Sequence, residues 1–349
     1  MLSYSRLIRR RIRCSSSMFC TQEHSICQLP TVHHRGSSAA RYSSSHSDSN
    51  VNNNPKTTDR VSFEIDESTG ICRVQLNRPN KLNAFDLAMF EAVAETASNL
   101  KKDRSIRAVV LSGRGRAFST GLDVKSVLKD GNPLKMIEQL LERRSRPYSA
   151  FPDDENDDDD DDANKNSGNI TSNLAQDVSI LWRELDVPVI AVLQGLCYGA
   201  GLQVALGADF RYSTPDCQLS IMEGKWGLVP DMGASILLRD LVRIDVAKEL
   251  TMTGRIVSGT EAADLGLVTH VCEDPMKEAG LFAEELVKRS PDAIAAAKQL
   301  FQATWTSASV NESLLLETKH QRKLLVSWNQ LASSGRSTTG WEIPYIKRK

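Results

Sequence analysis

Two carboxylates lie eight residues apart in a stretch that is otherwise largely apolar. Glu223 and Asp231 fall within residues 219–233, among leucine, isoleucine, methionine, tryptophan and valine. A carboxylate in such surroundings has a raised pKa and can exchange protons near neutral pH. The pair is therefore a candidate general acid and base. The structural alternatives are an ion pair of Glu223 with Lys225 and a helix cap at Asp231.

Two glycine-bearing turns follow strand-like runs, at residues 113–123 and 194–203. In the second turn, Gly199, Ala200 and Gly201 open a predicted helix whose first backbone N–H groups have no helical partner. Small residues allow a ligand to approach such N–H groups, so the turn could bind an anion. Either turn alone could equally serve close packing, and neither has the spacing of a dinucleotide or phosphate loop.

Strand-like and helical patterns alternate around these motifs, which predicts an α/β fold. Asn83 is a possible N-cap for the first helix. Beyond about residue 276 only helical patterns remain. The expected strands are 71–76, 106–111, 187–193, 210–213 and 267–271, and the expected helices are 84–101, 174–185, 279–289, 292–304 and 311–330.

The N-terminal segment differs in composition from the rest of the chain. Residues 1–58 hold eight basic and two acidic residues and many serines, which is typical of an organelle transit peptide followed by a disordered linker. We predict the mitochondrial matrix as the destination; the C-terminus lacks the Ser-Lys-Leu signal for peroxisomes. The predicted core is 59–275, with a helical region at 276–331 and a polar tail at 332–349.

An acidic segment interrupts the core. Nine of the ten residues 153–162 are acidic, which predicts a solvated, disordered insertion at about 150–170. The full chain has a net charge of −1, so the part beyond residue 58 carries −7. This charge argues against general binding of nucleic acids. The cysteines and histidines show no metal-binding spacing, and no apolar run is long enough to span a membrane.

The motifs together, in this order, resemble the crotonase superfamily, also called the enoyl-CoA hydratase/isomerase family. The resemblance covers roughly residues 60–330 without the acidic insertion. Residues 78–84 resemble the family's first coenzyme A contact, residues 118–123 its first oxyanion loop, and residues 199–201 its second. The family implies a spiral of ββα turns, with C-terminal helices that build homotrimers or homohexamers.

The resemblance also implies an acyl-CoA thioester as substrate, no separate cofactor and no metal. It places the thioester oxygen on the backbone N–H groups of Thr120 and Ala200. Such preorganised donors stabilise the negative charge of an enolate by roughly 2.7–4 kcal/mol each. The residues that it places around the substrate are Arg78, Lys81, Ala117, Ser119, Gly121, Leu122, Asp123, Gly199, Gly201 and Gln203.

Hydratases of this family use two glutamates, whose positions here hold Gln203 and Glu223. An amide cannot act as a base, so ordinary hydration is disfavoured. Glu223 followed by Asp231 resembles the delta-3,5-delta-2,4-dienoyl-CoA isomerases of β-oxidation, although those carry aspartate at the position of Gln203. The alternatives are a hydratase, or another family enzyme, that uses Glu223 alone, and a non-catalytic or RNA-binding homologue.

Overall fold

The computed structural model describes residues 56–57, 60–129, 133–149, 167–306 and 308–348. The predicted transit peptide and most of the predicted acidic insertion lie outside these residues. Those two assignments, and the mitochondrial destination that depends on the first, stay predictions. The predicted disorder is wrong at two margins, because Lys56–Thr57 form a strand and residues 167–170 lie in the strand Ser167–Ser172.

A seven-stranded sheet forms the centre of the described chain, in the order β1-β2-β3-β4-β7-β9-β12. The pairs β1–β2 and β2–β3 are antiparallel, and all later neighbours are parallel. The inner strands β4 and β7 are buried along their whole length, as expected for parallel strands covered on both faces. The strands are β1 Lys56–Thr57, β2 Val61–Asp66, β3 Ile71–Leu76, β4 Ala108–Gly113, β7 Val189–Leu193, β9 Phe210–Ser213 and β12 His270–Val271.

Two smaller sheets accompany the central one. The first has the order β11-β10-β8 and carries the glycine turn of residues 194–203 next to the acidic pair. The second is the antiparallel hairpin β5–β6, whose strands flank the acidic segment. The bounds are β8 Leu196–Tyr198, β10 Gln218–Ser220, β11 Val257–Ser258, β5 Arg144–Ser149 and β6 Ser167–Ser172.

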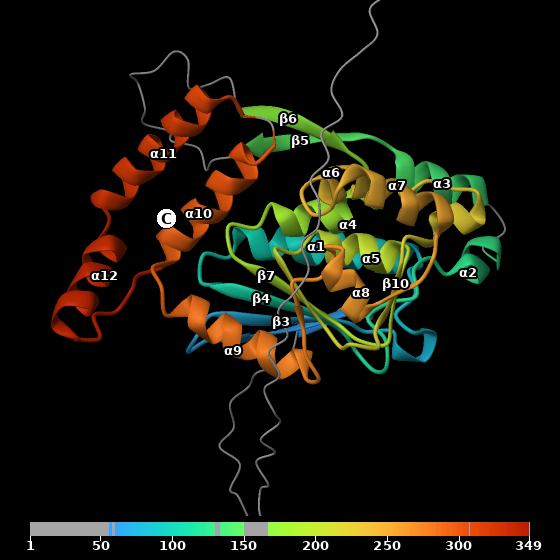
Figure 1. The fold of residues 1–349 in the computed structure, drawn as a ribbon, viewed down its shortest axis with the longest axis horizontal. Coiled ribbons are helices and arrows are strands. Elements are labelled where there is room, and N and C mark those ends of the chain that lie inside the picture. The colour runs from blue at the N-terminus through green and yellow to red at the C-terminus, as the bar shows by residue number, and fades with distance from the viewer. Residues whose placement is uncertain (1–55, 58–59, 130–132, 150–166, 307, 349) are drawn as a thin grey trace, which may run out of the picture. The chain divides into compact units, whose positions relative to one another are not determined.

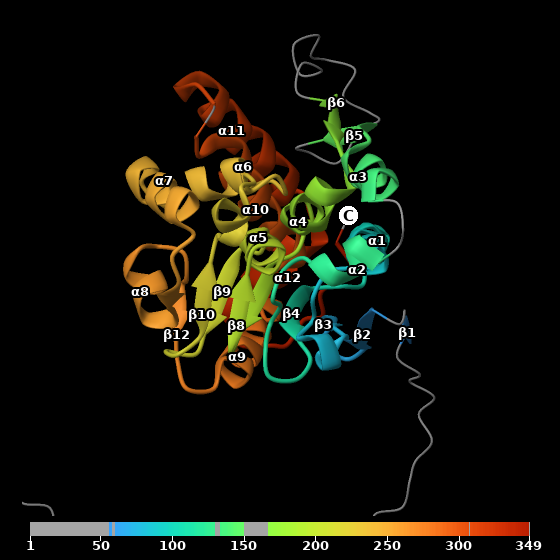
Figure 2. The same cartoon turned by 90° about the vertical axis from the view of Figure 1, so that its right-hand side faces the viewer.

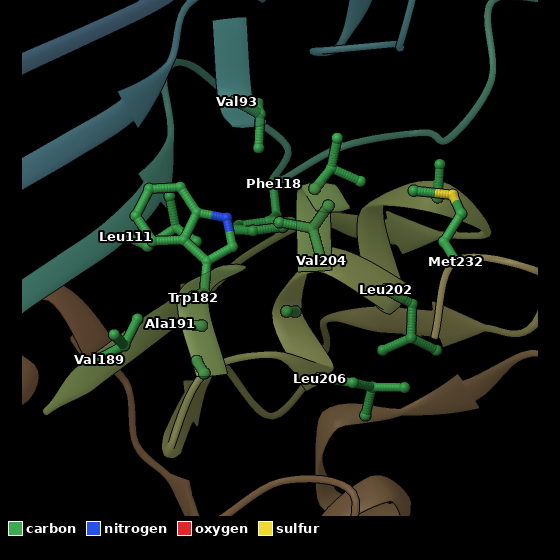
Figure 3. Close-up of a cluster of buried hydrophobic side chains, with 14 of the residues drawn as sticks. Val93, Leu111, Phe118, Trp182, Val189, Ala191, Leu202, Val204, Leu206 and Met232 are labelled. Carbon is green, nitrogen blue, oxygen red and sulfur yellow. The ribbon is translucent and has the colours of Figure 1, made fainter. Parts of the chain in front are cut away.

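Helices cover both faces of the central sheet (Figures 1 and 2). On one face α1 (Leu87–Lys102), α4 (Leu174–Arg183) and α5 (Ala200–Leu206) enclose the larger core. On the other face α9 (Pro275–Val287) packs small buried residues against the strands. Figure 3 shows side chains of α4 and α5 meeting those of β4 and β7 in the larger core. This core holds α5, and with it the second glycine turn, in a fixed position.

The remaining helices flank the second sheet and form the C-terminal region. They are α2 Val124–Lys129, α3 Pro133–Leu141, α6 Ala234–Arg239, α7 Ile244–Thr253, α8 Gly259–Asp264, α10 Pro291–Thr304, α11 Val310–Leu325 and α12 Trp328–Thr339, with the 3₁₀ turns η1 Pro79–Lys81 and η3 Met222–Trp226. No helix within the described ranges has the length and apolarity required to cross a membrane.

Several expected helix boundaries were wrong, and α9, for example, runs over Pro275–Val287 rather than over residues 279–289. Helix α1 starts at Leu87 rather than at residue 84, and its N-cap is Asp86, which accepts a hydrogen bond from the Met89 N–H. At the other end of the chain, the expected helix 311–330 is two helices, and α12 runs past residue 331 to Thr339. The first part of the predicted polar tail, up to Thr339, is therefore helical, because Ser327 caps a new helix.

Candidate active site

Glu223 lies at the second position of η3, immediately after the short strand β10. Its Oε1 accepts a hydrogen bond of 2.7 Å from Nε2 of Gln203. Its Oε2 is buried and has no hydrogen-bond partner within the described chain. A buried carboxylate oxygen without a partner is costly, and such atoms mark sites where a proton or a ligand is handled.

Burial raises the pKa of the Glu223 carboxyl above its ordinary value. The hydrogen bond from Gln203 and the residue's own backbone amide lower this pKa, while the negative charge of Asp231 raises it further. The net shift is upward, as expected for a general base that works near neutral pH. The prediction that apolar surroundings raise this pKa is confirmed.

Asp231 lies in the loop between η3 and α6, with part of its side chain exposed. Desolvation nevertheless raises the pKa of its carboxyl. Because the charge of Asp231 acts on Glu223, the two carboxyls lie within electrostatic range of each other. Burial is the main cause of the raised pKa of each carboxyl, and a raised pKa suits a group that takes up or gives a proton near neutral pH.

The predicted ion pair of Glu223 with Lys225 is not among the salt bridges of the described residues. The helix α6 begins after Gly233, which serves as its N-cap without a side-chain bond. Asp231 therefore does not cap that helix, and both structural alternatives for the acidic pair are set aside.

The backbone of the second glycine turn runs directly beside Glu223. A Cβ atom added to Gly199 would lie 3.3 Å from Oε1 of Glu223, so the carboxylate faces the Cα of this glycine. The next residue, Ala200, is the first of α5, and no acceptor in the described part of the chain takes its N–H group. This N–H group is available to a ligand, as the resemblance implies.

The other predicted oxyanion donor, Thr120, is already occupied. Its backbone N–H donates to the carbonyl oxygen of Leu82 at 3.1 Å, and its hydroxyl contacts the same oxygen. Leu82 reaches this position through a left-handed backbone with φ of 50°. The assignment of Thr120 was therefore wrong, because its amide is used inside the protein.

The amide of Leu122 is the better donor in this loop. Phe85 pairs with Leu122 in a parallel bridge, in which the Phe85 N–H bonds to Gly121 and the Asp123 N–H bonds to Phe85. In such a bridge the N–H of the middle residue points away from the partner strand. Among the described residues, none accepts it.

Close contact joins this loop to the second glycine turn. A Cβ on Gly121 would lie 3.4 Å from the backbone nitrogen of Ala200 and 2.8 Å from the Tyr198 carbonyl oxygen. Gly121 also has φ of +83°, which other residues rarely adopt. The amide that follows Gly121 and the amide of Ala200 are thus neighbours on adjacent segments.

Several predicted substrate contacts serve the protein itself. The Arg78 guanidinium bonds to Asp123 at 2.8 Å and pairs with Asp86 at 3.2 Å, so it is not a free phosphate ligand. These arginine contacts hold the pKa of Asp123 below its ordinary value despite its partial desolvation. Lys81 remains exposed and contributes positive charge near Asp123.

Ser119, Ala117 and Gly201 lie inside the framework of the two loops. Ser119 is fully buried and donates to the Asn83 carbonyl at 2.8 Å, and Ala117 is 1% exposed. A Cβ on Gly201 would lie 2.6 Å from the Ser119 side chain, so this glycine allows close packing. Of the predicted contacts, Gly121, Leu122 and Gly199 bring backbone close to Ala200 or Glu223, and Gln203 reaches Glu223 through its side chain.

Asn83 and Ser179 support the site, and the sequence did not identify either role. Asn83 is buried with φ of 55° and donates to the carbonyls of Arg114, Ala117 and Phe118, so it holds the first loop rather than capping α1. Ser179 on α4 donates a hydrogen bond to the Met232 carbonyl. No group of three or more metal-ligating side chains is placed to hold an ion among the described residues.

The family model for enoyl-CoA hydratase/isomerase matches residues 66–143 and 159–330, most of the chain. The chain belongs to this family, and with it to the crotonase superfamily. Carnitinyl-CoA dehydratase of Salmonella enteritidis PT4 is 30% identical over 246 residues, which are 70% of this chain and 81% of that protein. The predicted family is confirmed.

Solved structures of similar proteins show the same fold. The enoyl-CoA hydratase/isomerase of Mycobacterium abscessus superposes with a TM-score of 0.68 at 22% identity, covering 82% of this chain and all of that one. An enoyl-CoA hydratase of Streptomyces coelicolor A3(2) gives 0.69 at 24% identity, with 87% and 100% covered. These likenesses confirm the predicted α/β crotonase fold.

Proposed function

We propose that this protein isomerises the double bonds of an acyl-CoA thioester, with Glu223 and Asp231 as base and acid. The observation that carries the proposal is the position of Glu223, whose buried Oε2 has no partner and whose carboxylate faces the Gly199 backbone next to the free Ala200 amide. If the thioester oxygen accepts hydrogen bonds from the Leu122 and Ala200 amides, C2 of the substrate would lie next to the Glu223 carboxylate.

The proposed reaction converts a 3,5-dienoyl thioester to a 2,4-dienoyl thioester. Glu223 removes a proton from C2, and the electrons of that C–H bond delocalise onto the thioester oxygen, where the two amides stabilise the charge. The electrons then return to form the C2–C3 and C4–C5 double bonds, while Asp231 gives a proton to C6. The net change moves one proton, and C2 and C6 are too far apart for one carboxyl to serve both.

Hydration or dehydration is the second candidate, favoured by the names of the relatives. The similar Salmonella protein is a carnitinyl-CoA dehydratase, and the similar solved structures include enoyl-CoA hydratases. Against it stands Gln203, whose amide cannot take a proton from water. In this candidate Glu223 would work alone.

The replacement Asp231→Asn separates these candidates. We expect it to slow the conversion of 3,5-dienoyl-CoA by about 10²–10⁴-fold, because the C6 proton donor is lost. Exchange of the C2 proton with D₂O should continue, because Glu223 still removes it. Asp216→Asn, at an exposed turn residue, is the matched control and should keep the full rate.

The same assays include crotonyl-CoA as a substrate. Rapid hydration of crotonyl-CoA without any turnover of the dienoyl ester would exclude the isomerase and favour the hydratase. If the chain acts on no acyl-CoA and retains RNA in a salt-sensitive manner, the non-catalytic alternative gains support.

We also propose that the chain assembles as a homotrimer or homohexamer through its C-terminal helices. Large apolar side chains are exposed on this region, and exposure on this scale marks an interaction surface. They are Phe301, Trp305, Val310, Leu314, Leu315, Leu325, Val326, Trp328 and Leu331. Sedimentation equilibrium of the chain from residue 59 should give three or six times the protomer mass; a stable monomer would contradict the proposal.

A further inference from the structure

Both ends of the Gln203 side-chain amide are used inside the protein. Gln203 is fully buried on α5. Its Nε2 donates to Oε1 of Glu223 at 2.7 Å, and its Oε1 accepts from the Met232 N–H at 2.9 Å. These partners fix the orientation of the amide, because a carboxylate only accepts and a backbone N–H only donates. Both polar atoms of the Gln203 side chain are thus engaged by the protein.

The Met232 contact extends the influence of Gln203 to the second acid. The N–H that Gln203 holds belongs to the peptide that joins Asp231 to Met232. The carbonyl of Met232 is held from the other side by the buried hydroxyl of Ser179 on α4. Helices α4 and α5 therefore clamp the backbone next to Asp231, and the Met232 side chain is buried in the larger core (Figure 3).

We propose that Gln203 is a positioning residue that sets the orientation of Glu223 and the placement of Asp231, so that one side-chain amide links the two carboxylates of the site. This inference rests on the proposed function for its consequence in catalysis. In this role Gln203 acts through its contacts with Glu223 and with the Met232 N–H.

The amide gives the site a property that a glutamate at this position would not provide. A second carboxylate 2.7 Å from Glu223 would have to share a proton with it, because like charges at that distance do not both ionise. The amide instead donates to Oε1 in every protonation state. Oε2 is thereby left as the one oxygen of Glu223 without a hydrogen bond in the described chain, and it is the atom that takes the substrate proton.

Three variants test the role of Gln203. Gln203→Leu removes both hydrogen bonds, whereas Gln203→Glu keeps the shape and an acceptor for Met232, and the thermal midpoint of each variant shows whether it is folded. Ser179→Ala is the matched control, because it loosens Met232 without touching Glu223. We expect kcat to fall by about 10²-fold in both Gln203 variants, with KM changed by less than about twofold.

Exchange of the C2 proton with D₂O distinguishes the variants further. Both Gln203 variants should slow exchange of the C2 proton with D₂O together with isomerisation. Gln203→Leu loses the hydrogen bond that orients Glu223, and in Gln203→Glu the new carboxyl shares a proton with Glu223. Ser179→Ala should slow isomerisation while C2 exchange continues. In Gln203→Glu, the acidic limb of the kcat profile should move upward by at least about one pH unit, since the two carboxyls share a proton.

An infrared titration of the Glu223 carboxyl gives a readout that needs no turnover. The band is assigned as the one lost in Glu223→Gln. Asp231 is the charged group whose field acts on Glu223 among the described residues, so each titration is repeated with Asp231→Asn. Removing the Gln203 hydrogen bond should move the titration to higher pH, because this bond favours the carboxylate.

The positioning role of Gln203 and the proposed isomerase function would fail in different experiments. If Gln203→Leu titrates like the wild type and keeps its kcat and C2 exchange, the positioning role is overturned. If the wild type acts on no acyl-CoA but the infrared band still shifts in Gln203→Leu, the contact with Glu223 is confirmed and the proposed function is the part that fails. An unshifted band in Gln203→Glu would also overturn the role.

Discussion

Replacing Glu223 with glutamine is expected to lower kcat by about 10²–10⁴-fold with little change in KM. Removal of the C2 proton needs a carboxylate, and the glutamine amide cannot accept that proton. The replacement matches the site closely, because Nε2 of Gln203 can still donate to the new side-chain oxygen. Steady-state kinetics with 3,5-dienoyl-CoA and loss of C2 exchange in D₂O measure the effect.

The pH dependence gives a second test of the same residue. Burial raises the pKa of Glu223, and the base works only when ionised, so wild-type activity should fall as the pH drops through a value above 4.5. Because the folded pKa of Glu223 is raised, wild-type stability is lost as the pH rises from about 4.5 to that pKa and is level above it. The thermal midpoint of Glu223→Gln should rise relative to wild type over the same range. A variant with the wild-type rate would remove Glu223 as the base.

The sequence predicted the family, the α/β class and the raised pKa of the acidic pair, because these depend on local composition and on motif order. The strand Phe210–Ser213 and the core helices were found at nearly their actual positions. Buried parallel strands are short apolar runs bounded by glycine turns, and this pattern can be recognised in the sequence alone.

The choice between two amides in one loop could not be made from the sequence. Thr120 and Leu122 both flank Gly121, and only the hydrogen bonds show that the first is used by Leu82 while the second points away from Phe85. A backbone N–H has no side-chain signature. Its direction depends on pairing with residues more than thirty positions away along the chain.

Two other features were predicted incorrectly although the sequence carries a signal for each of them. Asn83 can cap a helix, but asparagine also tolerates the left-handed conformation, and here it uses that conformation to hold the first loop. The break between α11 and α12 could have been found, because Ser327 and Gln330 have the spacing of an N-cap pair. Ser179 has no such signal, since its partner Met232 is distant in sequence.

The replacement Ala200→Pro is expected to lower kcat/KM by about 10²–10³-fold, because it deletes one donor to the thioester oxygen. Proline lacks an N–H but fits the first position of a helix, where that group has no helical partner. The preceding Gly199, with φ of 49° and ψ of −120°, lies outside the helical region that a following proline disfavours. The fold should therefore tolerate the change.

Ala200→Ser is the matched control, because it alters the side chain and keeps the N–H. We expect this variant to retain most of its activity, and both variants to unfold near the wild-type temperature by circular dichroism. Since the loss in Ala200→Pro arises from enolate stabilisation, exchange of the C2 proton should fall by the same factor as turnover. If exchange and turnover persist in a folded Ala200→Pro protein, the thioester oxygen is not held by this amide, and the neighbouring Leu122 amide cannot form the proposed two-donor site with it.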